Sequence, residues 1–171
     1  TAVGSSGSVS GDWRSIGGLI GYNEWGHITD SHSSADVRGE VQVGGLVGAE
    51  MMGSIARCYS TGLVRGDSDG AGGLVGEVSG GSIVGSHSTG VVTGWLHVGG
   101  LVGYNYWGFI TTSYYDPPAA GDGIFSVTGG EFVGGLVGST NGSCDIVASY
   151  STGDVNGVSA VGGLVGKTGG A

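Results

Sequence analysis

The chain has 171 residues, of which 42 are glycine and 2 are proline, and it lacks the strict Gly-X-Y triplet that a collagen-like fold requires. Its 14 acidic and 5 basic residues give a formal charge of −9, which argues against binding to nucleic acid or to anionic lipid. Hydrophobic residues make up 39% and recur at regular intervals, which excludes a disordered Gly/Ser linker, while the frequent glycines disfavour helix.

An internal repeat runs through the sequence. The pentapeptide Gly-Gly-Leu-(Val/Ile)-Gly begins at positions 17, 44, 72, 99, 134 and 162, so the units are 27, 28, 27, 35 and 28 residues long. Each unit then carries an isoleucine, a small residue three positions later, and usually His or Tyr directly after that. Three short apolar stretches per unit, separated by glycine corners with positive φ, predict an all-β fold. We expect a β-solenoid (β-helix) of about six coils, with about 27–28 residues and three short strands per coil.

The coils follow directly from the positions of the pentapeptide. We expect one solenoid domain over residues 1–171, with a partial coil at 1–16, full coils at 17–43, 44–71, 72–98, 99–133 and 134–161, and a partial coil at 162–171. Stacking of the coils would place the repeat leucines and isoleucines in an interior ladder: Leu19, Leu46, Leu74, Leu101, Leu136, Leu164, Ile28, Ile55, Ile83, Ile110 and Ile146.

The fourth coil departs from the pattern. The segment 115–118 reads Tyr-Asp-Pro-Pro in place of Ser-Thr-Gly, and eight extra residues follow it. Because proline cannot donate to a strand ladder, we expect a protruding loop there.

These repeats resemble the GLUG-motif family, whose signature is the glycine-leucine-glycine pentapeptide, over residues 16–166. The resemblance implies an extracellular or cell-surface repeat region of large bacterial proteins, including regions that flank IgA-specific endopeptidases and haemagglutinin-like adhesins. It also implies a non-catalytic role, with no catalytic residue and no cofactor to carry over.

The two ends of the chain contain complementary parts of a coil. Joined tail to head, residues 162–171 and 1–16 give 26 residues, one short of a standard coil. An exposed rung of this kind is a template for another chain. We therefore expect a stalk or filament subunit that stacks head to tail as a homopolymer, with copies of itself as partners. The alternative is that these are cut points within a longer repeat array of the same protein.

Tryptophans reveal a longer period of three coils. Trp13 and Trp95 are 82 residues apart, and so are Trp25 and Trp107. Together with Tyr22 and Tyr104 they are candidates for a subunit interface or for glycan binding, because aromatic rings on a shallow surface serve both. The alternative function is thus an adhesin-type binding module that contacts glycans or a host protein. The same rings could instead cover glycine-rich backbone at the corners.

Other residues point to structural roles. His32 and His87 lie two coils apart, about 9.6 Å, so the His/Tyr column predicts an exposed aromatic ladder and no zinc site. Asp67 and Asp69 alternate in a glycine-rich turn and form a weak calcium candidate, although a solvated turn is favoured. Cys58 and Cys144 are three coils apart, about 14 Å, so we expect two free thiols with Cys58 buried.

The remaining signals are few. Asn141 begins a glycosylation sequon, whose use depends on the organism. Carbohydrate-cleaving β-helix enzymes need clustered carboxylates with Lys or Arg, whereas the five cations here are scattered along the coils. We therefore expect no enzymatic activity, no metal or other cofactor, no nucleic-acid partner and no membrane insertion.

Overall fold

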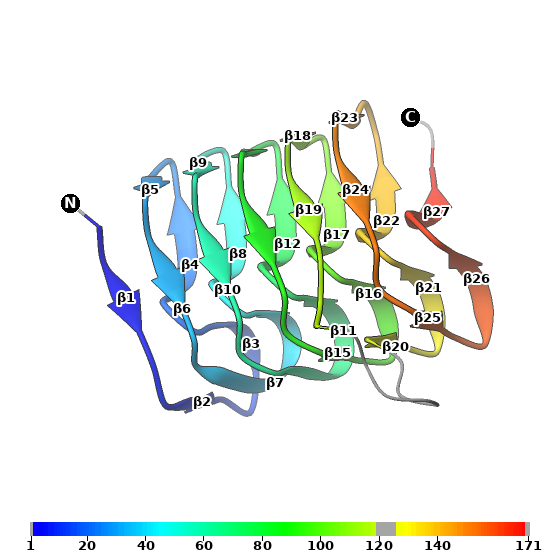
Figure 1. The fold of residues 1–171 in the computed structure, drawn as a ribbon, viewed down its shortest axis with the longest axis horizontal. Coiled ribbons are helices and arrows are strands. Elements are labelled where there is room, and N and C mark those ends of the chain that lie inside the picture. Colours follow the sequence, from blue (N-terminus) through cyan, green and yellow to red (C-terminus); the bar gives the residue numbers. More distant parts are fainter. Residues whose placement is uncertain (1, 119–125, 170–171) are drawn as a thin grey trace.

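The computed structural model describes residues 2–118 and 126–169, and in this part of the chain all regular secondary structure is β-strand. Figure 1 shows the chain winding from the N-terminal to the C-terminal end as a stack of similar coils. All strand pairs are parallel and join equivalent residues of neighbouring coils, for example Ile55 with Ile83 and Val75 with Val102. The predicted β-solenoid of about six coils is therefore confirmed.

Four sheets, here called A to D, run along the solenoid. Sheet C consists of β4 (Ile20–Glu24), β8 (Val47–Met51), β12 (Val75–Ser79), β17 (Val102–Tyr106), β22 (Val137–Asn141) and β27 (Val165–Thr168). Sheet D consists of β5 (His27–Thr29), β9 (Ser54–Ala56), β13 (Ser82–Val84), β18 (Phe109–Thr111) and β23 (Asp145–Val147). Sheet A consists of β1 (Gly4–Ser5), β6 (His32–Ser33), β10 (Tyr59–Ser60), β14 (His87–Ser88), β19 (Tyr114–Tyr115) and β24 (Tyr150–Ser151).

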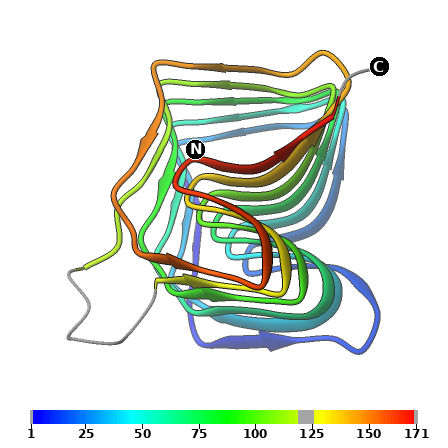
Figure 2. The same ribbon diagram turned by 90° about the vertical axis from the view of Figure 1, so that its right-hand side faces the viewer.

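Sheet B bends sharply, so that each coil crosses it twice. Its first arm contains β2 (Ser8–Ser10), β15 (Val92–Thr93), β20 (Val127–Thr128) and β25 (Val155–Asn156). Its second arm contains β3 (Arg14–Gly17), β16 (Leu96–Gly99), β21 (Glu131–Gly134) and β26 (Ser159–Gly162). Two long strands, β7 (Asp36–Gly44) and β11 (Val64–Gly72), run through both arms. Figure 2 shows this bend at the lower right, after which the chain folds back into the middle of the cross-section and enters sheet C.

The expectation of three strands per coil is wrong, because each coil contributes to four sheets and crosses one of them twice. The stretch from the isoleucine to the His/Tyr position contributes two of these strands. The structure divides it between sheets D and A at a residue with positive φ, such as Asp30 or Arg57.

The leucine and isoleucine columns lie inside the coils. Leu46, Leu74, Leu101 and Leu136 are fully buried, as are the isoleucines of the second to fourth full coils. Burial falls toward the two ends: Leu19 and Ile146 are only half-buried, and Leu164 is 39% exposed. The core is thus a continuous apolar ladder that depends on a neighbouring coil to cover each rung.

Glycine does not play the expected role at the corners. Among residues 2–118 and 126–169, twelve non-glycine residues have φ between 48° and 60°, and with four glycines they form three columns along the solenoid. One column is Ser15, Gln42, Gly70, His97, Phe132 and Ala160; the second is Trp25, Met52, Gly80, Trp107 and Gly142; the third is Asp30, Arg57, Gly85, Thr112 and Ala148. The prediction that glycines supply the positive-φ corners is therefore wrong at most of these positions.

The glycines of the pentapeptide are required by close backbone approach. A Cβ on Gly44 would lie 1.9 Å from the carbonyl oxygen of Val47 and 2.7 Å from the amide nitrogen of Gly76 in the next coil. A Cβ on Gly45 would lie 2.2 Å from the carbonyl oxygen of Gly73. The pentapeptide marks the place where the chain folds back inside the coil and the next coil stacks directly on it, so no side chain fits.

The fourth coil keeps its place in the stack despite its different sequence. Tyr115 takes the position that serine holds in the neighbouring strands of sheet A, and its ring is fully buried. Its hydroxyl group lies 3.0 Å from the carbonyl oxygens of Gly90 and Ser126, and burial raises the pKa of the phenol well above its usual range. Most of the predicted protruding loop, residues 119–125, lies outside the described residues.

Candidate functional surfaces

The four tryptophans occupy two corners of the solenoid and are all exposed. Trp13 and Trp95 lie at the bend of sheet B, where they precede β3 and β16. Trp25 and Trp107 lie between sheets C and D, with φ of 60° and 57°. The period of three coils in the sequence therefore corresponds to two pairs of equivalent corners.

Two of these rings cover glycine in the following coil. A Cβ on Gly130 would lie 2.7 Å from Cε3 of Trp95, and one on Gly142 would lie 2.6 Å from Cε2 of Trp107. One part of each indole thus rests on glycine backbone while the rest faces solvent. Backbone cover and a binding role, which the sequence presented as alternatives, are compatible at these positions.

The tyrosines of sheet C lie apart from the tryptophan corners. Tyr22 in β4 donates its hydroxyl to Sδ of Met51 at 3.1 Å. Tyr104 in β17 packs near His97, with ring centroids 4.8 Å apart. The structure therefore does not unite the six candidate aromatic residues in one surface.

A stacked aromatic ladder runs along sheet A. The ring centroids of successive coils lie 4.7 to 5.2 Å apart, and adjacent planes differ by at most 11°. The order is His32, Tyr59, His87, Tyr114 and Tyr150. Burial between the tyrosine rings lowers the pKa of His87. The expected stacking of the ladder is confirmed, but only Tyr59 and Tyr150 are exposed, while the other three rings are half-buried.

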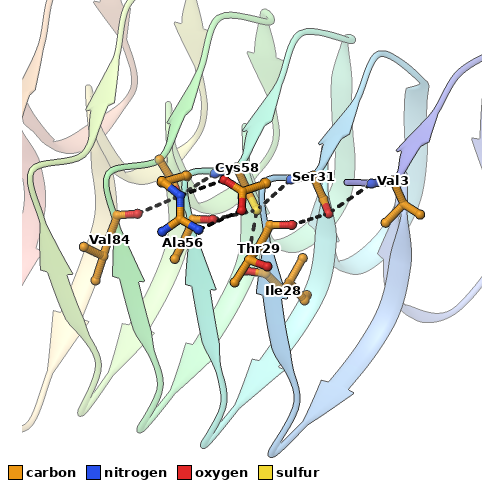
Figure 3. A network of polar contacts seen from close by, with 10 residues as sticks. Val3, Ile28, Thr29, Ser31, Ala56, Cys58 and Val84 are labelled. Atoms are coloured by element: carbon orange, nitrogen blue, oxygen red, sulfur yellow. Dashed lines mark hydrogen bonds and ion pairs between the residues drawn. The ribbon is translucent and has the colours of Figure 1, made fainter. Parts of the chain in front are cut away.

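A column of small polar residues forms a hydrogen-bonded chain inside the corner between sheets D and A (Figure 3). The Ser31 amide donates to Sγ of Cys58 at 3.4 Å, and that thiol lies 3.3 Å from the carbonyl oxygen of Ala56. The Cys58 amide in turn donates to Oγ of Ser86 at 3.1 Å. The same pattern continues through Ser113 and Ser149. This column satisfies backbone groups that the corner would otherwise leave unpaired.

The cysteines have the state that their spacing predicts. Both are free thiols, with Cys58 buried and Cys144 half-buried. Burial raises the pKa of the Cys58 thiol above its ordinary value. Cys58 therefore acts as a member of the small polar column.

The two aspartates of the weak calcium candidate contact different partners. Asp67 is paired with Arg38 at 3.0 Å and with Arg65 at 3.1 Å, and these hydrogen bonds lower the pKa of its carboxyl group. Asp69 lies 2.6 Å from Nδ1 of His97. Within the described ranges no group of three or more potential metal ligands comes together. The carboxylates of Asp67 and Asp69 thus contact different side chains, and calcium binding there stays a prediction.

One carboxylate is buried inside the solenoid. Glu50 in β8 is 1% exposed and accepts a hydrogen bond from Nδ2 of Asn23 at 2.7 Å. Burial raises the pKa of Glu50 to about 7, against the smaller opposing effects of Asn23 and of the Gly53 backbone. Sequence reasoning missed this residue, although a lone glutamate among neutral residues of the same column is a usable signal.

The bend of sheet B carries a second feature that the sequence did not predict. Arg14, Arg38 and Arg65 all lie there, near Asp12, Glu40 and Asp67. The expectation that the cations are scattered along the coils is therefore wrong for three of the five. A usable signal was the extra residue in the second unit, residues 44–71, since a bulge there re-aims side chains.

Asn141 lies at the end of β22, where its side chain is half-buried and its Nδ2 atom is 3.4 Å from the hydroxyl group of Tyr104. Its use as a glycosylation site stays a prediction.

Comparison with known proteins supports the fold and the repeat. A family model described as the GLUG motif matches residues 14–38. The chain also aligns over 99% of its length, with a TM-score of 0.74 and 23% identity, with a crystal structure from Bacteroides ovatus described as a putative immunoglobulin A1 protease. The chain covers 56% of that protein, little more than half, and at this identity the likeness concerns the fold. No curated protein matches the chain. Among residues 2–118 and 126–169 there is no helix that could span a bilayer.

Proposed function

Because residues 14–38 carry the GLUG motif and the chain folds as a β-solenoid, we propose that it is a mechanical repeat region of a secreted or surface protein. In this role it acts as a non-catalytic stalk or filament segment that holds other parts of an assembly at a fixed distance.

The observation that carries this proposal is the unbroken nearest-neighbour stacking. In each of the five full coils the amides of the repeat leucine and of the next residue donate to the leucine carbonyl of the following coil. Leu46 and Val47 both donate to Leu74, at 2.9 and 3.0 Å. Such a stack gains stability additively with each coil and forms an extended rod without a central hinge.

We further propose that the stack continues head to tail into a second copy of the chain. The last coil exposes apolar side chains, with Val158 81%, Val161 45% and Leu164 39% accessible. Their equivalents in the preceding coil include Val133 and Leu136, which are fully buried. A coil of the same kind would cover this face with the same residues and hydrogen bonds that join the internal coils.

Negative-stain electron microscopy beside light scattering tests this arrangement. The purified chain is expected to form thin filaments with an axial repeat of about six coils, roughly 29 Å. Leu164→Asp places a charge in the end face and is expected to leave short rods, whereas Leu63→Asp places the same charge on the exposed side wall and should leave filaments intact. Monodisperse rods of about 17 kDa for the unmodified chain would contradict self-assembly and leave a stalk within one longer polypeptide.

A second candidate function is a binding module. It is favoured by the exposure of the tryptophans at the bend of sheet B, where Trp13 is 74% and Trp95 is 60% accessible. Indole rings are highly buried on average, and exposed tryptophans are enriched at interfaces, where the ring supplies a large contact area. Glycans and host proteins are the partners that such a module would contact.

A further inference from the structure

A β-bulge interrupts the bend of sheet B in the second full coil, residues 44–71. The register between β7 and β11 shifts between Gly66 and Asp69, which inserts Asp67 and Ser68 where the neighbouring coil has Glu40 alone. Bulges re-aim side chains and are frequent beside functional sites. Here the bulge directs the carboxylate of Asp67 between two arginines.

The resulting ion-pair cluster holds three planar groups together at the surface. Arg38 Nη2 lies 3.0 Å and Arg65 Nε lies 3.1 Å from the Asp67 carboxylate. The side chains of Arg38, Arg65 and Asp67 remain 62%, 65% and 41% exposed. Solvent therefore weakens their mutual attraction, and part of their hydrogen-bonding capacity stays free. The cluster therefore offers both donors and acceptors to a ligand.

Three surface depressions meet at this cluster. The largest, about 720 Å³, is lined by residues 10–12, 38–40, 67 and 68. It shares Glu40 with a depression beside Trp13 and Asp67 with a depression beside Trp95. Together they form the bend surface, defined here as residues 10–14, 38–41, 65–68 and 93–95, which lies on the lower right corner in Figure 2.

The two tryptophans frame the bend surface. They occupy the same position in the partial coil 1–16 and in the coil 72–98, three coil spacings apart, or about 14 Å along the axis. Trp95 rests on the backbone at Gly130 and is thereby held as a platform. Indole faces of this kind stack on the apolar faces of sugar rings.

The charge of the bend surface argues for a neutral ligand. Its three arginines, at 14, 38 and 65, balance its three acids, at 12, 40 and 67, so its formal charge is zero in a chain of net charge −9. An anionic ligand would find no excess of cations there, and a cationic ligand no excess of acids. Hydroxyl groups can use both kinds of partner.

We propose that the bend surface binds a neutral oligosaccharide along the solenoid axis, with sugar rings on Trp13 and Trp95 and hydroxyl groups hydrogen-bonded to Arg38, Asp67 and Arg65. This proposal names the site and the ligand class of the binding module, and it rests on that second candidate function. It is independent of the mechanical role, which the electron-microscopy experiment tests separately.

Isothermal titration calorimetry of the full chain tests the proposal, with cellohexaose, maltohexaose, xylohexaose and mannohexaose as neutral probes and trigalacturonic acid as an acidic probe. We expect binding of at least one neutral probe. Trp13→Ala and Trp95→Ala should each weaken it about tenfold, and Asp67→Asn should weaken it as well. Trp107→Ala at the other corner is the matched control and should bind as the unmodified chain does.

Circular dichroism verifies that each variant folds, and Trp95→Phe, which keeps a ring, should retain part of the affinity. Binding of the acidic probe alone would overturn the assignment to a neutral ligand. An equal loss in Trp107→Ala, or no loss in Trp13→Ala and Trp95→Ala, would overturn the bend surface as the site. Absence of binding to every probe would overturn the proposal as a whole.

Discussion

Replacing Glu50 by glutamine should change how the stability of the solenoid depends on pH. The side chain lies inside the coil with one hydrogen bond from Asn23, and burial raises the pKa of Glu50 from 4.5 to about 7. In the unfolded chain the group ionises near pH 4.5, while in the folded chain it stays protonated up to about pH 7. The unfolded state therefore loses the proton first, and stability falls as the pH rises through this window.

The size of the effect follows from the rise in the pKa of Glu50 from 4.5 to about 7 on folding. At 1.36 kcal/mol per unit this corresponds to about 3 kcal/mol, present below pH 4.5 and lost above pH 7. Glutamine has nearly the same shape, keeps an oxygen for the Asn23 amide and does not ionise. Glu50→Gln should thus match the unmodified chain within about 1 kcal/mol at pH 4 and exceed it by about 3 kcal/mol at pH 8.

Urea unfolding followed by tryptophan fluorescence at pH 4 and pH 8 measures this difference. Glu24→Gln removes a charge from the exposed end of β4 and serves as the control, with an expected change within about 0.5 kcal/mol at both pH values. A constant offset between Glu50→Gln and the unmodified chain across this range would refute the reasoning, because it would mean that the buried carboxyl group ionises as in water.

Three further predictions concern stability and use the same unfolding assay. Gly44→Ala should lower the free energy of unfolding by about 3 kcal/mol or more, because the added Cβ meets backbone at 1.9 Å. Gly163→Ala should change this free energy little, because its Cβ would meet nothing within 4 Å. Thr112→Gly should gain about 0.5–1 kcal/mol by relieving a φ of 48°, whereas Thr111→Gly, within β18, should lose about 1 kcal/mol. Cys58→Ala should lose about 1–3 kcal/mol because it leaves a buried amide unpaired, and Cys58→Ser should stay within about 1 kcal/mol.

Each of these pairs can fail separately. Equal losses in the two glycine variants would show that close approach is not what excludes a side chain from the pentapeptide. A loss in Thr112→Gly as large as in Thr111→Gly would show that the left-handed conformation carries no strain. Equal stability of the two Cys58 variants would show that the polar column does not contribute to the stability of the fold.

The sequence predicted the architecture because its repeat is regular in both length and chemistry. A leucine or isoleucine at a fixed place in every unit can be buried only if equivalent residues stack, and this specifies parallel pairing and its register. The His/Tyr position follows by the same logic. Once Tyr59 lies between His32 and His87 on neighbouring rungs, their rings are brought to stacking distance.

The wrong predictions concern positions where the residue type does not determine the backbone conformation. Gln42 and Phe132 adopt positive φ although neither favours it, because packing above and below determines the corner. Arg38 and Arg65 are register partners in neighbouring coils, and the register shift between Gly66 and Asp69 adds the Asp67 carboxylate that both of them contact. Neighbours predicted only from the number of residues per coil do not take such a register shift into account.

Amide hydrogen exchange in the last coil tests the central claim, that coils stack beyond the end face, most directly. The amides of Leu136 and Val137 both donate to the carbonyl of Leu164, and those of Leu164 and Val165 would donate in the same way to a further coil. We predict that exchange at Leu164 and Val165 slows as protein concentration rises, while exchange at Leu136 stays slow throughout. Fast exchange at Leu164 and Val165 at every concentration would contradict stacking between copies of the chain.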